Sequence, residues 1–309
     1  MRVLFVSSGN KGHVKPLVEN QAISLKNQGL TVDHFLVNSS GLFGYLRNII
    51  PLKKKLRSAD YSVVHAHYSF SGFLAVLAGS KRLVVSLMGS DTYIGPVFRL
   101  LIRLCYLYLW RATIVKTPQM RDILKATRAY VIPNGIDDKT FIPIPKSEAR
   151  KAINYPADRT LILFLADPAR PEKNFKLAID AVKCINRSEV DLVPIFDREP
   201  SSIPFYLNAA DVLLLTSNYE GSVNAVKEAM ACNTKIVSTD VGDVRVNLEK
   251  VNGSFVCANN KEDLAKGLVM ALSFKDTVNS RTQLMRLGLD SGTTAKRLIQ
   301  VYEKVAGQK

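Results

Sequence analysis

The stretch that decides the fold is residues 210–231, ADVLLLTSNYEGSVNAVKEAMA. It begins with an apolar run of strand length and ends with apolar residues at helical spacing, so it predicts a buried strand, a loop and a helix. Gly221 permits close backbone approach in that loop, and Ser222 is placed to cap the helix. The N–H groups of the first helical turn then offer a site for an anion such as a diphosphate.

Strands and helices alternate along the rest of the chain. In residues 1–143, segments of helical pattern separate the apolar runs VLFVS, VDHFLV, VVHAH, LVVSL, ATIVK and YVIPN. This alternation predicts an α/β fold with parallel strands and helices on both faces of the sheet. The run FIPIPK at 141–146 interrupts the pattern with two prolines, and the pattern restarts at TLILFLA.

These observations predict two Rossmann-like domains. We place the first at residues 1–143 and the second at residues 144–290, and we expect a C-terminal helix at about residues 291–309 to pack back on the first domain. Ligands bind at the carboxyl ends of strands in open α/β sheets, so the two domains are expected to face a ligand cleft.

Length and composition exclude several classes of protein. With 309 residues, 47% hydrophobic and 22% charged, the chain is neither fibrous nor disordered. Four widely spaced cysteines without a CxxC pair argue against a zinc ribbon, a redox pair and a disulfide scaffold, and they favour the reducing cytoplasm. Residues 1–10 lack the apolar core of a secretory signal, and residues 97–110 are too short and too charged to span a bilayer.

The net charge of +15 is unevenly distributed. Residues 1–143 carry +12 (19 basic and 7 acidic residues), whereas residues 144–309 carry +3 (23 and 20). A basic surface of this size attracts anionic lipid, nucleic acid or phosphorylated substrates. No RNA- or DNA-binding motif accompanies the charge, so we expect no nucleic-acid partner.

Residues 44–130 hold 14 basic residues against three acidic ones. On the helix expected over residues 95–110, basic and aromatic residues form one stripe, and leucines occupy the opposite side, which we expect to face the core. The stripe suits an anionic bilayer surface, although a core helix whose arginines simply reach solvent also accounts for it. The stripe consists of Arg99, Arg103, Tyr106 and Trp110, and the expected core positions are Leu100, Leu101, Leu104 and Leu107.

A second charged motif, RPEKN at 170–174, follows a predicted strand. Arg170 can clamp two phosphate oxygens and Lys173 can neutralise developing charge, although a solvated charged loop is the alternative. On the helix of residues 210–231, the carboxylate of Glu228 can accept hydrogen bonds from both hydroxyls of a ribose. A capped helix with a solvated Glu228 is the alternative there.

Together these segments resemble glycosyltransferase family 4, the retaining group 1 enzymes of GT-B fold. EGSVNAVKEAMAC is similar to the family's E-x7-E signature, and ARPEKN to its phosphate-binding arginine and lysine. Further similar segments follow the family's order over most of residues 1–257: VVHAHYSFSG, GSDTY, VIPNGIDDKTF, ADVLLLTS and IVSTDVGDV. The resemblance implies sugar transfer from a UDP- or GDP-sugar without an essential metal or a further cofactor, and the four histidines show no HExxH motif.

The resemblance also implies roles for single residues. It assigns Arg170 and Lys173 to the donor diphosphate, Glu220 to the transferred sugar and Glu228 to the ribose, and it adds the start of the helix to the donor site. That helix start consists of Gly221, Ser222, Val223 and Asn224. We take Glu220, Arg170 and Lys173 as the catalytic set.

The loop GNKGH at 9–13 follows the first predicted strand. The corresponding glycine loop of the family lies between donor and acceptor, so Gly12 is the strongest candidate there, with Lys11 and His13 beside it. A plain turn between strand and helix is the alternative.

The chain departs from the family pattern in several places. Met88 stands where members often carry a histidine that reaches the donor sugar, and Asp91 either takes over that hydrogen-bonding role or caps a helix. Val223 stands at a common proline position, and GDVR at 242–245 replaces G-G-x-x-E. Only residues 197–208 separate DLVPI from DVLLLTS, so the second domain is expected to be reduced.

These features favour a cytoplasmic, metal-independent hexosyltransferase, peripheral on the inner face of the membrane. Its acceptor is expected to be a glycan or a lipid-linked molecule of cell-surface polysaccharide or lipopolysaccharide synthesis. A non-catalytic sugar-nucleotide sensor or scaffold is the alternative, because Met88 and the short second domain are departures. A GT-B sugar-nucleotide epimerase would need its own set of catalytic acids and ranks below transfer.

Overall fold

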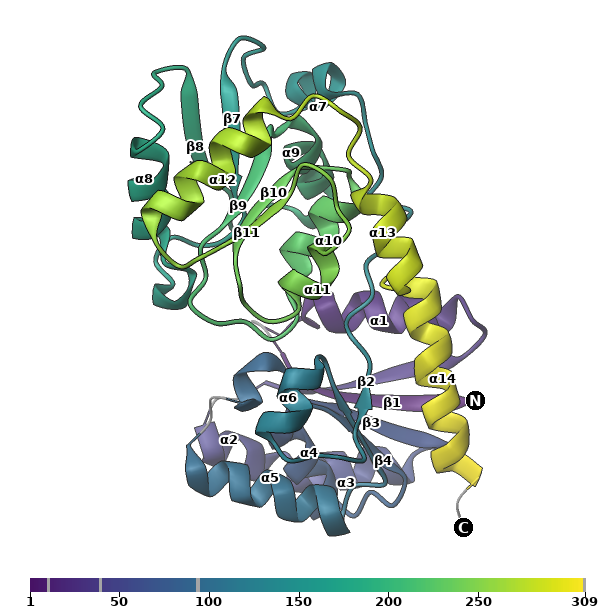
Figure 1. Ribbon diagram of the computed structural model, residues 1–309. Helices are drawn as coiled ribbons and strands as arrows, with labels where there is room; N and C mark the ends of the chain where they lie inside the picture. The colour runs from purple at the N-terminus through teal and green to yellow at the C-terminus, as the bar shows by residue number, and fades with distance from the viewer. Residues whose placement is uncertain (10–11, 39–40, 93–94, 308–309) are drawn as a thin grey trace. The chain divides into compact units, whose positions relative to one another are not determined.

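The chain folds into two compact units (Figure 1). Unit 1 comprises Met1–Gly135 and Ser291–Lys309, and unit 2 comprises Ile136–Asp290. Both units are α/β, as predicted. The structure is a computed structural model, and it describes residues 1–9, 12–38, 41–92 and 95–307.

The boundary between the units falls at Gly135 and Ile136. It precedes the two prolines from which residues 143 and 144 were expected as the boundary. The reason is that the backbone N–H of Ile136 already donates to the carbonyl of Leu289 in unit 2, at 2.9 Å. Backbone pairing therefore begins unit 2 before its first helix.

The described residues of unit 1 form six strands, eight helical segments and one parallel sheet. The strands are β1 (Arg2–Ser8), β2 (Thr31–Val37), β3 (Val63–His67), β4 (Leu83–Ser86), β5 (Ala112–Val115) and β6 (Tyr130–Val131). The helices are α1 (Pro16–Lys26), α2 (Gly41–Arg47), α3 (Ile49–Arg57), α4 (Ser69–Leu77), η1 (Gly89–Thr92), α5 (Pro96–Tyr108), α6 (Pro118–Ile123) and α14 (Ser291–Gly307).

The sheet of unit 1 has the order β2-β1-β3-β4-β5-β6. Strands β3, β4 and β5 are buried along their whole length, which is typical of parallel strands covered on both faces. One face packs against α1 and α14, and the other packs against α3, α4, α5 and α6. The predicted βα repetition therefore produces one closed three-layer core.

Helix α14 belongs to unit 1 although it ends the chain. Its Tyr302 is fully buried, and the Tyr302 hydroxyl lies 2.6 Å from Nδ1 of His65 on β3. The other ring nitrogen of His65 lies 2.8 Å from the hydroxyl of Ser86 on β4. Burial holds the pKa of His65 well below its ordinary value, so the neutral ring joins α14 to the sheet.

On helix α5, Arg99 and Arg103 are exposed as predicted, but the aromatic residues and the leucines have exchanged places. Its buried strip is Ile102, Cys105 and Tyr106, and Trp110 just after it is also buried. The Tyr106 hydroxyl accepts the backbone N–H of Arg128 at 2.6 Å, which anchors the aromatic side against unit 1. The leucines expected in the core are exposed: Leu100 59%, Leu101 40%, Leu104 46% and Leu107 39%.

Unit 2 contains five strands and nine helical segments. The strands are β7 (Thr160–Phe164), β8 (Val190–Pro194), β9 (Val212–Leu215), β10 (Ile236–Thr239) and β11 (Phe255–Cys257). The helices are α7 (Lys146–Ala152), η2 (Pro171–Lys173), α8 (Phe175–Lys183), η3 (Pro200–Ser202), α9 (Ile203–Ala209), α10 (Asn224–Ala231), α11 (Val244–Leu248), α12 (Lys261–Ser273) and α13 (Ser280–Leu287).

The sheet of unit 2 has the order β11-β10-β9-β7-β8, and all its strand pairs are parallel. Strand β9 shows the alternation that makes both faces apolar: Leu213 and Leu215 join the core with α9 and α10, and Val212 and Leu214 join the core with α8 and α12. In this order β7 and β9 are parallel neighbours, so the segments that follow them both start at the carboxyl ends of the strands.

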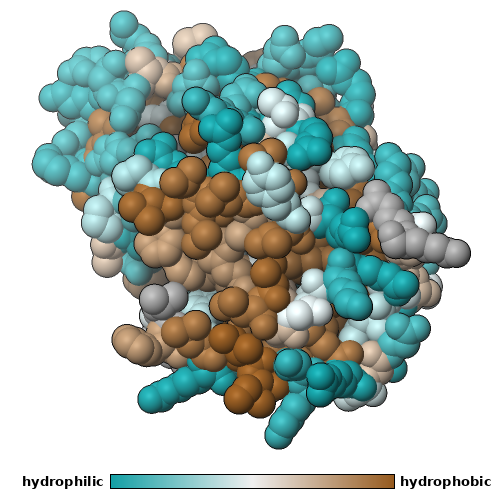
Figure 2. All heavy atoms as spheres, turned by 90° about the horizontal axis from the view of Figure 1, so that it is seen from below, coloured by the Kyte–Doolittle hydropathy of each residue, from teal (hydrophilic) through white to brown (hydrophobic). Residues whose placement is uncertain are grey.

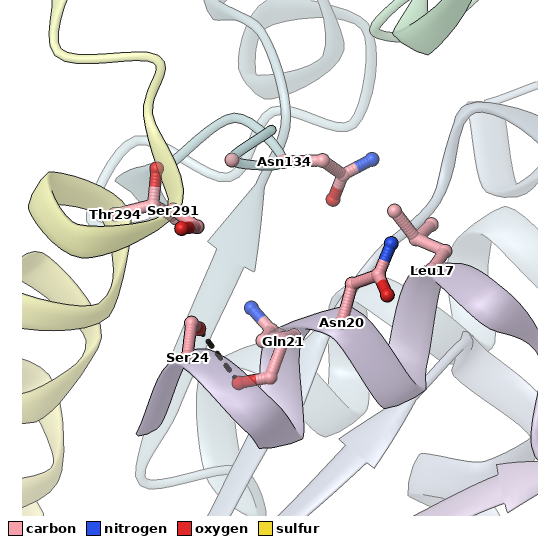
Figure 3. A pocket seen from close by; sticks show the side chains of 8 residues that line it. Leu17, Asn20, Gln21, Ser24, Asn134, Ser291 and Thr294 are labelled. Atoms are coloured by element: carbon pink, nitrogen blue, oxygen red, sulfur yellow. Dashed lines mark hydrogen bonds between the residues drawn. The ribbon is translucent and has the colours of Figure 1, made fainter. Parts of the chain in front are cut away.

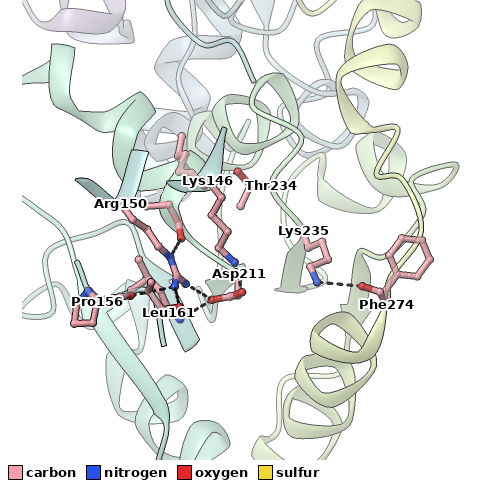
Figure 4. A network of polar contacts seen from close by, with 11 residues as sticks. Lys146, Arg150, Pro156, Leu161, Asp211, Thr234, Lys235 and Phe274 are labelled. Atoms are coloured by element: carbon pink, nitrogen blue, oxygen red, sulfur yellow. Dashed lines mark hydrogen bonds and ion pairs between the residues drawn. The ribbon is translucent and has the colours of Figure 1, made fainter. Parts of the chain in front are cut away.

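A buried arginine ties the amino ends of these strands together (Figure 4). Arg150 of α7 donates to the carboxylate of Asp211, the residue before β9, at 2.9 Å. The same carboxylate accepts the backbone N–H of Leu161 on β7 at 2.7 Å. Arg150 also donates to the carbonyl of Pro156 at 3.0 Å. The register of β7 and β9 is therefore held at the end opposite to the candidate site.

Candidate functional site

The two charged motifs of unit 2 meet at the carboxyl ends of β7 and β9. The motif RPEKN continues from β7 into η2, and the loop before α10 continues from β9. The backbone N–H of Asn218 donates to the carbonyl of Glu172 at 2.9 Å, and the hydroxyl of Thr216 donates to the carbonyl of Lys173 at 2.9 Å. Hydrogen bonds thus hold together two loops that lie more than 40 residues apart in sequence.

Lys173 and Glu220 form an ion pair at this edge. Their side chains are only 14% and 18% exposed, so solvent screens the pair weakly. The hydroxyl of Ser217 also donates to the carboxylate of Glu220, at 2.9 Å. The structure therefore brings together two of the three residues predicted as catalytic, and Ser217 adds a contact that the sequence motif does not include.

Arg170 lies beside them and is more open. Its Nε donates to the carboxylate of Glu172 at 2.8 Å, and its side chain is 55% exposed. The backbone amide of Glu172 and the Arg170 guanidinium hold the pKa of Glu172 below its ordinary value. The guanidinium thus stays accessible to an anion, while Glu172 keeps it close to η2.

The start of α10 differs from the expectation that Ser222 caps it. Val223 is the N-cap residue and is buried, and the helix begins at Asn224. The Ser222 hydroxyl instead donates to Asp243 at 2.8 Å, and the Val223 N–H donates to the other oxygen of the same carboxylate at 2.9 Å. Asp243, which comes after β10, therefore holds the turn that the sequence assigned to Ser222.

A buried lysine completes this arrangement. The side chain of Lys227 is fully buried and lies 3.1 Å from the Asp243 carboxylate, which is 11% exposed. A Cβ on Gly242 would lie 2.3 Å from the carbonyl oxygen of Gly221, and Gly242 has a φ of +57°. Only glycine fits this approach without displacement. Sequence reasoning noted GDVR at 242–245 as a departure but missed this contact, because its partners come from another loop.

Glu228 lies on α10, four residues after the helix start, which is about 6 Å along the axis. Its side chain is only partly exposed, and burial raises its pKa to about 7, with Lys227 acting in the opposite direction. This is not the solvated position of the alternative interpretation. A carboxyl group that titrates near neutral pH can accept hydrogen bonds from a diol once it is ionised.

The candidates of the loop between β1 and α1 in unit 1 are Gly12, Lys11 and His13. Gly12 has a φ of +85° and is exposed, and His13 is also exposed. Lys11 lies outside the described residues. Gly12 thus occupies a left-handed turn between β1 and α1, which any βα turn of this shape would need.

Asp91 is fully buried, and its carboxylate binds backbone rather than facing outward. It accepts the N–H of Ser69, the first residue of α4, at 3.2 Å, and the N–H of Met88 at 2.6 Å. Burial raises its pKa to about 6. In this structure Asp91 therefore holds the start of α4, which agrees with the alternative that it caps a helix, and we correct its assignment as a substrate-binding residue.

Unit 1 also contains a small polar pocket (Figure 3). Asn20 and Gln21 of α1 and Thr294 of α14 contribute to its lining, with Asn134 between the two helices. Its volume of about 10 Å³ has room for one water molecule at most. This pocket is too small for a sugar or a nucleotide.

Comparisons with known proteins identify the family. Residues 12–140 match the profile described as Glycosyltransferase Family 4, and residues 191–273 match the profile described as Glycosyl transferases group 1. The chain belongs to glycosyltransferase family 4, group 1. The predicted resemblance is confirmed. The first match covers residues 12–135 of unit 1 of this family 4 protein and the first five residues of unit 2, and the second match lies within unit 2.

One relative is similar to this chain in sequence, and two solved structures are similar to it in fold. The family 4 protein is 24% identical over 286 residues to TuaC of Bacillus subtilis, a glycosyltransferase whose name assigns it to teichuronic acid biosynthesis, covering 81% of this chain and 72% of TuaC. The structure of sucrose-phosphate synthase from Thermosynechococcus elongatus superposes with a TM-score of 0.80 at 16% identity, over 98% of each chain. Anabaena HepE, solved with UDP and glucose, gives 0.75 at 16% identity, over 98% of this chain and 100% of HepE. The fold is GT-B, as predicted.

Proposed function

We propose that this protein transfers a sugar from a nucleoside diphosphate sugar to a glycan or lipid-linked acceptor, with retention of configuration. The observation that carries the proposal is the cluster of Arg170, Lys173 and Glu220 beside the start of α10. It combines two cations, one carboxylate and a helix N-terminus at the carboxyl edge of a parallel sheet, where α/β folds bind ligands.

In the proposed reaction, the bond between the anomeric carbon of the sugar and the diphosphate breaks. The acceptor hydroxyl forms the new glycosidic bond and releases its proton. Arg170 and Lys173 stabilise the negative charge that develops on the leaving diphosphate, together with the positive end of the α10 helix dipole. Fixed cations of this kind supply charge stabilisation through the protein itself, so we propose a metal-independent reaction.

The two glutamates position the donor in this proposal. The carboxylate of Glu220 accepts hydrogen bonds from the transferred sugar, and the carboxylate of Glu228 accepts them from the ribose diol. The pair of Lys173 with Glu220 supports this arrangement, since it places the leaving-group cation next to the sugar-binding carboxylate.

The relatives guide the choice of donor and pathway. HepE was solved with UDP, glucose and UDP-glucose, and the name of TuaC refers to teichuronic acid, a polysaccharide. We therefore propose a UDP-sugar, or a GDP-sugar as the second choice, and an acceptor in cell-surface polysaccharide or lipopolysaccharide synthesis. The acceptor side is assigned to unit 1, in the cytoplasm at the inner face of the membrane.

A panel of nucleotide sugars tests the proposal. For each donor, the shift in Tm and the slow release of nucleoside diphosphate are measured with the wild-type protein and with Lys173→Ala. We expect one selective donor, from which the wild type releases nucleoside diphosphate and the variant does not. Binding without release, with or without glycan and lipid-linked acceptors, would favour a non-catalytic sensor. Failure of every donor to shift the Tm would overturn the donor site.

A further inference from the structure

Unit 1 carries an apolar surface on α2, α3 and α5. We call it the α2–α5 surface. Figure 2 shows the molecule from this side, with apolar side chains gathered together. On α5 alone, Val97 is 75% exposed and Tyr108 is 78% exposed, and only three of thirteen residues are buried. The exposed apolar residues of the surface are Phe43, Leu46, Ile50, Val97, Phe98, Leu100, Leu101, Leu104, Leu107, Tyr108 and Leu109.

The helices of this surface are in contact through aromatic rings. Phe70 of α4 lies 5.6 Å from Tyr45 of α2 and 5.2 Å from Phe98 of α5, measured between ring centroids. Helices α2 and α3 also contact each other and α4. These ring contacts link α2 and α5 through α4, on the side where Figure 2 shows apolar side chains gathered together. Exposed apolar surface of this extent marks an interaction site in soluble proteins.

The charged residues of the three helices are all basic. Helices α2, α3 and α5 contain no aspartate or glutamate. Among the described residues, none of their basic side chains lies in an ion pair within 4 Å. These basic residues are Arg47, Lys53, Lys54, Lys55, Arg57, Arg99 and Arg103.

Helix α5 has the dimensions of an interfacial helix. Its thirteen residues extend about 20 Å, and no helix in the described part of the chain is long and apolar enough to cross a membrane. A helix with leucines on its outer side and basic residues along it suits the boundary between headgroups and acyl chains. A second copy of this chain would bring the same positive charge to the same surface, which disfavours self-association.

We propose that the α2–α5 surface seats this protein on an anionic lipid bilayer, with α5 in the plane of the interface. The leucines of α5 enter the outer acyl region, and Lys53, Lys54 and Lys55 of α3 contact anionic headgroups. Membrane binding would bring the enzyme to a lipid-linked acceptor, and in this respect the inference rests on the proposed function. Membrane binding itself is measured without any sugar donor.

Co-sedimentation with vesicles tests the proposal. The full chain is mixed with vesicles of phosphatidylcholine alone or with 30% phosphatidylglycerol. We expect binding to the anionic vesicles that weakens several-fold between 50 and 500 mM NaCl. Leu100→Asp with Leu104→Asp is expected to lower the partition coefficient at least tenfold. Lys53→Gln, Lys54→Gln and Lys55→Gln together are expected to remove most of the salt dependence.

The control is Met270→Asp on α12, which also changes an exposed apolar residue (54% exposed) but lies in unit 2. It should bind vesicles within twofold of the wild type. Donor-induced Tm shifts and diphosphate release in the absence of vesicles should be unchanged in all these variants, which separates this proposal from the donor site. Unchanged vesicle binding by the double aspartate variant would overturn the proposal.

A fluorescent probe tests insertion directly. Leu104→Cys is labelled with an environment-sensitive dye in a Cys184→Ser background, because Cys184 is the exposed cysteine and the other three are buried. A blue shift on addition of anionic vesicles, with quenching by lipids spin-labelled in the acyl chain, is expected. No shift would overturn the insertion of α5 into the bilayer. Dimerisation in solution that the aspartate substitutions abolish would show that a second copy of the chain covers the surface instead.

Discussion

The ammonium of Lys173 pairs with the carboxylate of Glu220, although the two residues lie 47 positions apart in sequence. The pair brings opposite charges together at the carboxyl ends of β7 and β9. Ser217 donates to the same carboxylate at 2.9 Å, so Glu220 remains positioned if Lys173 turns toward a phosphate. The geometry thus provides a cation that a diphosphate can recruit without releasing the carboxylate beside it.

Loss of the cations should slow transfer. Lys173→Ala is expected to lower kcat by about 100- to 1,000-fold, because it removes a preorganised charge next to the leaving group. The more exposed Arg170→Ala is expected to lower kcat by about tenfold. Initial rates of nucleoside diphosphate release with a saturating donor measure both effects.

The matched control is Lys176→Ala. Lys176 lies in the first turn of α8, close to the same motif, but it is 85% exposed and pairs with Asp180. Its loss should leave the rate unchanged, and all three variants should unfold at the wild-type urea concentration. Wild-type rates in both Lys173→Ala and Arg170→Ala would remove the assignment of these residues to the diphosphate.

Glu228 should make stability depend on pH. Its pKa is raised from 4.5 to about 7 by burial, so between these values the folded state holds a proton that the unfolded chain has released. The free energy of unfolding should therefore fall as pH rises from 5 to 8. Glu228→Gln should lose this dependence and gain about 1–3 kcal/mol over the wild type at pH 8. Urea unfolding at both pH values measures the difference.

The same titration should appear in nucleotide binding. If the ionised Glu228 accepts the ribose hydroxyls, the affinity for UDP or GDP should increase as pH rises from 6 to 8. The matched ligand is the 2′-deoxynucleotide, whose affinity should depend less on pH. Equal pH profiles for the two nucleotides would show that Glu228 does not contact the ribose.

Asp243 should be essential for the stability of unit 2. Asp243→Ala leaves the buried Lys227 without its carboxylate and the Val223 N–H without its acceptor, which should cost about 3–5 kcal/mol. Lys227→Met combined with Asp243→Ala should recover part of this loss, since no unpaired charge remains buried. Urea denaturation of the single and double variants measures the coupling free energy between Lys227 and Asp243.

The control for this pair lies on the same loop. Asp240 pairs with Arg245, but both are substantially exposed, at 48% and 66%. Asp240→Ala should leave the unfolding midpoint unchanged, because exposed pairs contribute little. A midpoint for Asp243→Ala equal to that of Asp240→Ala would contradict the role assigned to Asp243.

Gly242→Ala should destabilise the loop that contains Gly221, before α10, through a direct clash. A Cβ at this position would lie 2.3 Å from the Gly221 carbonyl oxygen, in addition to the strain of a φ of +57°. Gly79→Ala is the control, because Gly79 has a φ of +87° with nothing within 4 Å of the added carbon. Gly242→Ala should lower the Tm more than Gly79→Ala and should also weaken nucleotide binding. Equal Tm losses would show that the contact with Gly221 is unimportant.

The position of the candidate site in the fold could be predicted because its motifs are local. Arg170 and Lys173 follow one apolar run, Glu220 follows another, and residues after parallel strands share one edge of the sheet. The contact of Asp243 with Val223 was missed, since it joins loops after different strands. For Asp91, the contacts with the N–H groups of Ser69 and Met88 agree with the helix-capping alternative and not with the substrate-binding assignment.

Sequence periodicity alone determined that the chain alternates strands and helices, since residues two or four positions apart share a face whatever surrounds them. It also determined the charge imbalance between the two halves. Only the tertiary structure decided which side of α5 is buried. Both sides of that helix are apolar enough for the core, and the fit of Tyr106 and Trp110 against the rest of unit 1 selected one of them. The leucines were left on the surface, because burial depends on the partner that a helix meets and not on hydrophobicity alone.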